Sequence, residues 1–388
     1  MKHPVILLTF FLFFLLSCSK KNAGQENTAP QPVYYTWDYF CMGADLSYAN
    51  ELEDNGAVYR DSSQVKDIFR IFREHGANTV RVRLWHDPQW EKPLTGGKLY
   101  SDLADAEKTI RRAKELGMAV DLDIHFSDTW ADPGRQDTPA AWDSLSLDGL
   151  KDSVYQYTLD VLNYLKSQSV TPEMVQIGNE VNAGMLWPLG KVQNDVWTSF
   201  GALLNSGIRA VRDFSAGSAI KPLIILHVAQ LQNADWWISH VIQQGQVTDF
   251  DILGISHYSK WSTVNSMQQI TTTIKSLRTS YGKEVMIVET AYPWTPDNAD
   301  SYPNTFGIAD AVSGYPLTQQ GQEKYLEDLT QAVISGGGKG IMYWEPDWIT
   351  SSMHDSWGTG SSWDNCTFFD FSGNWMPGLV FMTRAYPF

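Results

Sequence analysis

The sequence predicts a single (β/α)8 barrel, in which eight parallel strands form a closed sheet inside a ring of helices. Eight short apolar runs alternate with longer amphipathic stretches, which is the pattern of repeated βα units. Polar or aromatic residues follow each run, as expected where strand ends form the mouth of a barrel. We expect residues 37–388 to form one domain, because barrels of this type commonly extend well beyond the length of other single cores.

The predicted strands are short apolar runs separated by helical stretches, at residues 41–45, 79–85, 119–125, 174–178, 223–227, 252–256, 285–289 and 340–344. The run 65–72 has apolar residues at helical spacing and stops at Gly76. The run 102–116 does the same, with Ser101 as the predicted N-cap and Gly117 after its end. Glycines at 282 and 336–338 end two further helices just before a strand.

Side chains that can carry chemistry follow the C-terminal ends of these strands. In chain order they are Asp45, Arg83, His125, Asn179 with Glu180, His227, His257 with Tyr258, Glu289, and Trp344 with Glu345. One such residue could be a chance loop cap, but eight in register are hard to explain by stability alone. They should share one face of the barrel, which is where active sites of this fold lie.

Glu180 and Glu289 are the predicted catalytic pair. They follow the fourth and seventh strands, which face each other across the barrel mouth. Taken singly, either glutamate could equally cap the next helix. Two carboxylates on opposite sides of a bound sugar are what glycoside cleavage needs, because one protonates the leaving oxygen and the other attacks or stabilises the cationic centre.

Neighbouring residues are expected to divide the work between the two glutamates. Arg81 and Arg83 share the inward side of strand two, and a cation there would keep Glu289 ionised. The alternative, an ion pair inside the barrel mouth, is compatible with that role. Further expected roles are a hydrogen bond from Asn179 to the sugar 2-hydroxyl, a hydrogen bond from Tyr258 to Glu289, and an apolar floor from Trp344.

Composition restricts the class of partner. A net charge of −15 and a pI near 4.9 make nucleic acid a poor partner. The chain has 16 Trp, whose flat rings can stack on sugars. Five lie in loops on the predicted catalytic face, and we expect two or three of them to contact sugar: Trp85, Trp130, Trp142, Trp294 and Trp348.

The histidines and cysteines leave other possibilities to weigh. His86, His125, His227 and His257 invite a metal-hydrolase interpretation, but strand one ends in Asp45 and not in the His-x-His pair that this chemistry needs. Export would make a disulfide between Cys41 and Cys366 chemically feasible. Both could equally be buried small apolar residues.

The N-terminus reads as an export signal. Residues 1–18 have a basic start and an apolar run too short to span a bilayer comfortably. The run ends at Cys18 in a sequence that resembles a bacterial lipobox, so we expect lipidation there; the alternative is an ordinary cleaved signal. Residues 19–36 are polar and proline-containing, as in a flexible tether.

Several sequence motifs follow one another in barrel order: 43–48 (GADLSY), 78–85 (NTVRVRLW), 125–134 (HFSDTWADPG), 178–180 (GNE) with 184–188 (GMLWP), 289–294 (ETAYPW) and 343–346 (YWEP). In these motifs the chain closely resembles glycoside hydrolase family 53, the endo-β-1,4-galactanases, within a retaining clan of (β/α)8 glycosidases. The most specific of the motifs is 125–134.

This resemblance implies retaining hydrolysis of the β-1,4-galactan in pectic type I arabinogalactan, with no cofactor required. It assigns the acid/base role to Glu180 and the nucleophile role to Glu289, with carboxyl groups about 5–5.5 Å apart. Together with the strand ends it predicts these substrate contacts: Asp45, Arg81, Arg83, His125, Asp128, Trp130, Asn179, His227, His257, Tyr258, Trp294 and Trp344.

Two loops depart from the family pattern. The usual Tyr-Tyr-Pro after strand six is 257–259 (HYS) here, and the usual His-Leu-Asp-Asn on strand five is 227–230 (HVAQ), so substrate contacts from these loops should differ. Bacillus-type members hold calcium in the loop after strand seven. The oxygen-bearing residues here are Asp297, Asn298, Asp300 and Asn304, with Tyr302 where a His is expected. A solvated polar loop is the open alternative.

Two other functions remain open from the residues alone. One is a retaining β-glycanase of the same clan acting on mannan or glucan, and the other is a non-catalytic, lipid-anchored glycan-binding protein. We expect a monomer anchored to the outer membrane, on the cell surface or the periplasmic face. The residues after Cys18 (19–21, SKK) lack the acidic run that often accompanies surface export.

Overall fold

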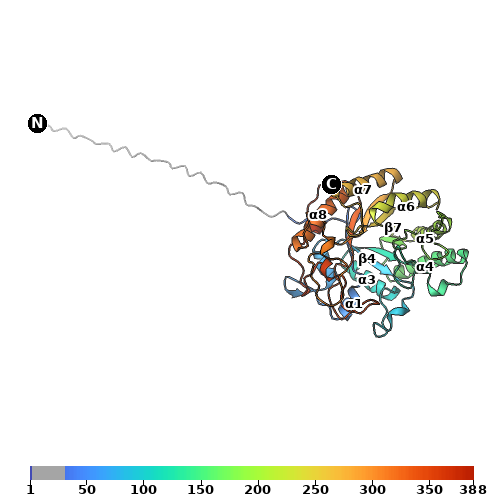
Figure 1. Ribbon diagram of the computed structural model, residues 1–388, viewed down its shortest axis with the longest axis horizontal. Helices are drawn as coiled ribbons and strands as arrows, with labels where there is room; N and C mark the ends of the chain where they lie inside the picture. Colours follow the sequence, from blue (N-terminus) through green and yellow to red (C-terminus); the bar gives the residue numbers. More distant parts are fainter. Residues whose placement is uncertain (2–30) are drawn as a thin grey trace. The chain divides into compact units, whose positions relative to one another are not determined.

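Eight parallel strands close into a barrel, which confirms the predicted fold class (Figure 1). The computed structural model describes Met1 and residues 31–388. Its barrel strands are β1 (Cys41–Asp45), β4 (Thr79–Leu84), β5 (Ala119–Ile124), β6 (Met174–Ile177), β7 (Leu223–Ala229), β8 (Ile252–Ser256), β9 (Glu284–Glu289) and β10 (Gly340–Tyr343). Neighbours around the barrel follow chain order, and β10 pairs with β1 to close it.

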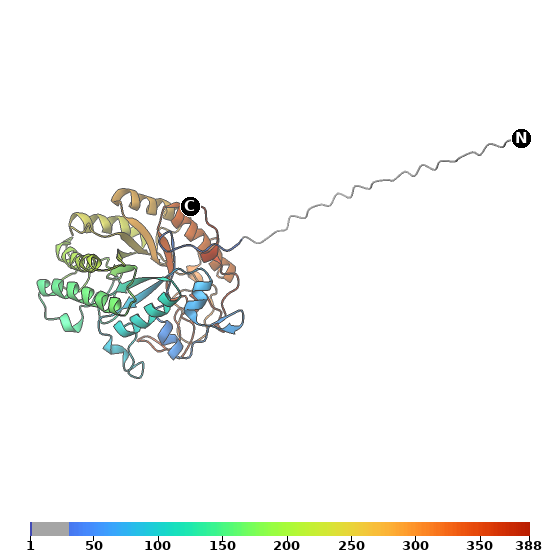
Figure 2. The same ribbon diagram turned by 180° about the vertical axis from the view of Figure 1, so that it is seen from behind.

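Helices cover the outside of the barrel (Figure 2). They are α1 (Ala49–Asp54), α2 (Ile68–Glu74), α3 (Leu103–Glu115), α4 (Leu147–Ser167), α5 (Thr198–Ala216), α6 (Leu231–Gln243), α7 (Met267–Tyr281) and α8 (Gln319–Ser335). Both α1 and α2 precede β4, and in the described chain no α-helix follows β10. The eighth unit therefore ends in loops and short turns, the last of which packs against α8.

Short secondary-structure elements lie in the segments outside the barrel strands and the α-helices. A two-stranded hairpin, β2 (Arg60–Asp61) with β3 (Gln64–Val65), lies between α1 and α2. Single 3₁₀ turns are η1 (Gln89–Glu91), η2 (Ala140–Trp142), η3 (Ile308–Asp310), η4 (Asp364–Cys366) and η5 (Phe381–Thr383). The loops that hold η1 to η4 follow strands β4, β5, β9 and β10, so they enlarge the face where the strands end.

Two helices begin later than the sequence pattern predicts. Val65 lies in β3, and α2 starts only after Asp67, whose side chain accepts a hydrogen bond from the Arg70 N–H (3.0 Å). The N-cap of α3 is Asp102, which accepts from the Asp105 N–H (2.9 Å), and not Ser101. In both cases an aspartate with extended backbone satisfies a free amide of the first turn, and this fixes the start of the helix.

The barrel interior changes from apolar to polar along its axis. The part of the interior farther from the C-terminal ends of the strands is filled by a small apolar cluster: Cys41, Met174, Ile225, Ile252, Met286, Val288 and Met342. Above this cluster the inward positions are occupied by buried polar groups, among them Arg81, Asp123 and Gln176. Cys366 belongs to the separate cluster between barrel and helices, and both thiols are buried and unpaired. The apolar cluster thus supports a polar layer just beneath the mouth.

Residues 2–30 lie outside the described residues; they include all of the predicted signal peptide (1–18) except Met1, the predicted lipidation site Cys18 and most of the predicted tether (19–36). Contacts with the barrel begin before residue 37, because the Val33 N–H donates to the Thr383 carbonyl (2.8 Å). Tyr35 also packs on Tyr386. Across the described chain, no helix has the length and apolar character needed to cross a bilayer.

Candidate active site

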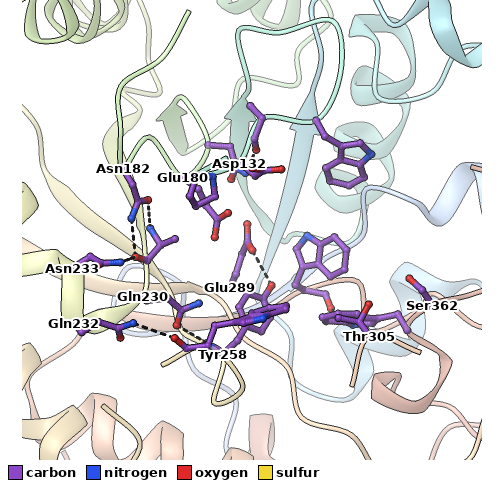
Figure 3. Close-up of a pocket in the computed structure, with 18 of the residues that line it drawn as sticks. Asp132, Glu180, Asn182, Gln230, Gln232, Asn233, Tyr258, Glu289, Thr305 and Ser362 are labelled. Carbon is purple, nitrogen blue, oxygen red and sulfur yellow. Dashed lines mark hydrogen bonds between the residues drawn. The ribbon is translucent and has the colours of Figure 1, made fainter. Parts of the chain in front are cut away.

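A cleft with a volume of about 630 Å³ lies at the C-terminal ends of the barrel strands. Its wall contains both predicted catalytic residues, Glu180 and Glu289 (Figure 3). Tryptophans line part of it, and four amide side chains from the loop after β6, the connection after β7 and the first turn of α6 lie together on the other side (Figure 3). The lining includes Trp130, Asp132, Asn179, Glu180, Asn182, Gln230, Gln232, Asn233, Tyr258, Trp261, Glu289, Trp344, Trp348 and Trp363.

Glu289 is the last residue of β9, and two donors hold its carboxylate. One oxygen pairs with Nη1 of Arg81 at 2.9 Å. The other accepts a hydrogen bond from the Tyr258 hydroxyl at 2.8 Å (Figure 3). Burial raises the pKa of Glu289, whereas the guanidinium and the phenol lower it. The two contacts stabilise the anion and fix the direction of its lone pairs.

Glu180 lies in the turn after β6 and is only half-buried. Burial and the negative charge of Glu289 raise the pKa of Glu180 to about 8. None of the described ion pairs joins an arginine to this carboxyl group. A shared proton is therefore favoured on Glu180 and the negative charge on Glu289, as expected for two carboxylates with unlike surroundings.

Arg81 connects the nucleophile candidate to the polar layer of the barrel. Besides Glu289, its guanidinium pairs with Asp45 and Asp123, each at 2.8 Å, and donates to Oδ1 of Asn179 at 2.9 Å. All these groups are buried. Despite burial, Arg81 and His125 hold the pKa of Asp123 at about 2. Asp121 lies farther away, at 4.0 Å, so one cation faces four carboxylates and orients the residue that precedes Glu180.

We expect Arg81→Met to destabilise the fold by about 3–5 kcal/mol, because it leaves buried carboxylates without their counter-charge. The pH dependence has a definite sign. Paired with Arg81, Asp123 stabilises the fold above its unfolded pKa; in the variant, burial disfavours its charge and Arg81 no longer offsets that cost, so the loss should grow as pH rises. Urea unfolding at pH 5 and pH 8 measures this difference, and an equal loss at both values would contradict it.

The structure places four of the predicted substrate-binding residues on the cleft wall, namely Trp130, Asn179, Tyr258 and Trp344. Five others lie buried behind the wall: Asp45, Arg81, Arg83, His125 and His227. Their partners explain this position. The Arg83 guanidinium pairs with Glu345 (3.2 Å) and stacks against aromatic rings, and Nε2 of His125 contacts Asp123 (3.0 Å). These residues support the wall and do not form it.

Three more predicted contacts lie away from the cleft wall. Asp128 accepts hydrogen bonds from the main-chain N–H groups of Asp87 and Ala140. The indole N–H of Trp294 donates to the Asp364 carbonyl. His257 is fully buried with no hydrogen-bond partner on either ring nitrogen, and burial lowers its pKa to about 4. Since side chains alternate along a strand and Ser256 points inward to His227, the next residue turns away from the mouth.

The amide side of the cleft was not predicted from the sequence. It consists of Asn182, Gln230, Gln232 and Asn233 (Figure 3). Gln232 accepts from the Ser262 hydroxyl and donates to the Trp261 carbonyl, each at 3.1 Å, so the start of α6 and the loop after β8 hold each other in place. The only sequence signal was the departure from the family pattern at 227–230. Uncharged amides inside loops otherwise look like ordinary surface residues.

A second hollow of about 320 Å³ continues the cleft past the tryptophan side. The two share five wall residues: Trp130, Asp132, Trp344, Trp348 and Ser362. Of the five loop tryptophans singled out in the sequence, Trp130 and Trp348 line these hollows. Trp357, which is 64% exposed, stands at the far end. The site is therefore an open, aromatic groove and not a closed pocket.

Among the predicted calcium ligands, the oxygens of Asp300 are bound by protein donors, whereas the side-chain oxygen of Asn304 is buried without a hydrogen-bond partner. Asp300 accepts hydrogen bonds from the Tyr302 and Ser361 main-chain N–H groups and from the Thr350 hydroxyl. Side-chain nitrogens of Asn298 and Asn304 donate within the same loop region. In the described part of the chain, no group of three or more His, Cys, Asp or Glu side chains has the arrangement of a metal site. Calcium at Asp297, Asn298, Asp300 and Asn304 therefore stays a prediction, and the protein donors on Asp300 count against it.

Comparison with known proteins connects this groove to a family. The model of glycosyl hydrolase family 53 matches residues 41–382. An arabinogalactan endo-β-1,4-galactanase of Cellvibrio japonicus is 43% identical over 100% of this chain and 98% of its own length. An endo-β-1,4-galactanase of Bacillus subtilis is 32% identical, over 88% of this chain and 84% of its own length.

Solved structures agree with the sequence comparison. The family 53 catalytic domain of Ignisphaera aggregans superposes with a TM-score of 0.81 at 34% identity, covering 92% of this chain and 99% of that one. The matches span the whole barrel, including the loops that carry Glu180 and Glu289. The chain belongs to glycosyl hydrolase family 53.

Proposed function

We propose that this protein hydrolyses β-1,4-galactosidic bonds within the chains of type I arabinogalactan, with retention of anomeric configuration. The observation that carries the proposal is the unlike environment of two glutamates in one groove. Glu289 has a cation and a phenol on its carboxylate, whereas burial and charge favour the proton on Glu180. The names of the relatives from Cellvibrio japonicus and Bacillus subtilis support galactan as the substrate.

In the first step, a Glu289 oxygen attacks the anomeric carbon while Glu180 gives its proton to the glycosidic oxygen. The bond to the leaving sugar breaks and a glycosyl ester forms on Glu289. Arg81 and Tyr258 hold the attacking carboxylate in position. Asn179 lines the groove beside both glutamates and is held by Arg81, which suits it to contact the sugar 2-hydroxyl.

In the second step, Glu180 is a carboxylate and takes a proton from water. The water oxygen attacks the anomeric carbon, the ester bond breaks, and Glu289 leaves as a carboxylate. Two displacements at the same carbon restore the original configuration. The long aromatic groove supports cleavage inside a chain, because sugars can extend past both glutamates and stack on exposed rings.

Release of reducing sugar tests the proposal against the alternatives. Potato galactan, mannan and carboxymethylcellulose are each incubated with the pure enzyme, and products are followed by chromatography and by proton NMR. We expect release from galactan only, with oligosaccharides first and the β-anomer as the initial product. Release from mannan or carboxymethylcellulose alone would indicate another glycanase, and no release from any would indicate a binding protein.

The ionisation of the two glutamates predicts a bell-shaped pH profile for kcat/KM. Activity needs Glu180 protonated, so it should fall as pH rises through about 8. It also needs Glu289 ionised, so it should fall again on the acid side as that group gains a proton. Initial rates with galactan at constant ionic strength measure both limbs. A rate that stays level well above pH 9 would contradict the assignment of the proton to Glu180.

Removal of divalent cations should leave the protein unchanged. Incubation with EDTA followed by gel filtration is expected to alter neither the melting temperature nor the rate on galactan, because protein donors already bind the oxygens of Asp300. Added calcium should likewise not raise the melting temperature. A rise of several degrees with calcium would restore the loop after β9 as a metal site.

We further propose that the enzyme is an exported monomer held at the outer membrane by a lipid on Cys18. The support is the residue pattern of 1–18, because this segment lies outside the described residues. Partition into detergent of the full chain and of Cys18→Ala tests the anchor, and gel filtration of the released enzyme tests the monomer. If the two chains partition alike, the anchor is refuted. Protease treatment of intact cells distinguishes the surface from the periplasm.

A further inference from the structure

Gln136 is a buried amide in the loop between β5 and α4, behind the cleft wall. Its side chain is 2% exposed. Its amide nitrogen donates to the main-chain carbonyls of Asn179 (2.8 Å), Asp132 (3.1 Å) and, more weakly, Glu180 (3.4 Å). The main-chain carbonyl of Gln136 also accepts a hydrogen bond from the main-chain N–H of Trp187 at 2.7 Å. One residue thus joins the loop after β5 to the turn that carries Glu180.

The turn at Glu180 needs such support because its backbone is strained. Glu180 has a φ of +45°, in the left-handed region that residues with a side chain rarely adopt. The structure holds it from two sides. Its N–H donates to Nδ1 of His227 at 3.2 Å, and Gln136 donates to the carbonyls of the two peptide units that flank the Glu180 Cα. These contacts fix the peptide planes that set the direction of the Glu180 side chain.

We propose that Gln136 is a positioning residue for the acid/base Glu180. The inference rests on the proposed function and deepens it, because it names a group outside the cleft wall on which proton transfer depends. Gln136 does not line the cleft, so its removal takes no direct contact away from the substrate, and Arg81 still holds the Asn179 side chain. Removal of Gln136 should instead allow the Glu180 turn to relax and move the carboxyl group away from the glycosidic oxygen, and small displacements of this kind reduce rates strongly.

The test separates steps that need an acid from steps that do not. Galactan has a poor leaving group and needs protonation, whereas a 2,4-dinitrophenyl β-galactobioside leaves without it. For Gln136→Ala we expect kcat on galactan to fall about 10–100-fold with KM unchanged. The kcat/KM for the dinitrophenyl substrate, which reports glycosylation alone, should change less than about threefold. Gln136→Glu keeps the size but, when ionised, cannot donate, and should resemble Gln136→Ala.

Thr138→Val is the matched control. The Thr138 hydroxyl donates to the Trp187 carbonyl at 2.8 Å, so it joins the same loops without touching the Glu180 turn. Its loss should leave both rates near those of the wild type. A double variant gives a second readout: adding Gln136→Ala to Glu180→Ala should produce no further loss on galactan, because the group being positioned is already absent.

Three outcomes would overturn the inference. They are equal losses of Gln136→Ala on both substrates, no loss on either, or additive losses in the double variant. Melting temperatures of all variants identify a folding defect, and Gln136→Glu keeps the test valid if Gln136→Ala is unstable. Inactivity of the wild type on galactan would instead refute the proposed function, and the dinitrophenyl substrate would still report whether the glutamates act.

Discussion

Replacement of Glu289 by alanine should lower the rate of hydrolysis on the order of 10⁵-fold. Removal of an essential catalytic group from a hydrolase has effects of this size. The loss should be similar for galactan and for dinitrophenyl β-galactobioside, because attack at the anomeric carbon is needed for both. Arg81 and Tyr258 still surround the vacated position but supply no nucleophile. Initial rates on the two substrates measure the effect.

Azide provides the control for this variant. With the dinitrophenyl substrate, azide can enter the space left by the side chain and attack from the same face. Glu289→Ala should then release dinitrophenol again and form an α-galactosyl azide, which proton NMR identifies. The fold should persist, because Arg81 keeps Asp45 and Asp123 as partners. Residual activity above about one per cent without azide would remove Glu289 from the nucleophile role.

The barrel and its catalytic face were predictable because they rest on patterns that local sequence carries. Apolar runs at regular intervals identify strands, and the order of strands places Glu180 and Glu289 at opposite sides of one mouth. The inward position of Arg81 was predictable too, because side chains alternate along a strand and Arg81 and Arg83 are two residues apart. The sequence did not indicate that many of these inward side chains would pair with one another and so be withheld from substrate. Arg81, Asp45 and Asp123 form such a buried network, with little exposed surface.

The cleft wall was harder to predict because it is built by loops. Asn182 and Gln230 come from the connections after β6 and β7, and Gln232 comes from the first turn of α6; their positions depend on distant contacts, such as that of Gln232 with Ser262. His257 was predicted to contact substrate because it follows the end of a strand. In the structure it is buried and turned away from the barrel mouth. Gln136 carried no sequence signal at all, since only the carbonyls that it meets reveal its position.

Glu180→Ala should show the opposite substrate dependence from Glu289→Ala. On galactan we expect a loss of about 10²–10⁴-fold, the usual contribution of a positioned acid. On dinitrophenyl β-galactobioside, kcat/KM should stay within a few fold of the wild type, because the leaving group needs no proton. The second displacement still lacks its base, so the glycosyl ester should accumulate and kcat should fall.

That accumulation gives the variant a signature that a folding defect cannot imitate. Stopped-flow measurement should show a burst of dinitrophenol equal to the enzyme concentration, followed by slow turnover, and mass spectrometry should detect the ester on Glu289. Azide, which needs no base, should accelerate the slow phase and give a β-galactosyl azide. The alkaline limb of the pH profile should also disappear, since the group whose pKa is raised to about 8 is gone. Equal losses on both substrates, with no burst, would show that Glu180 does not act as the acid.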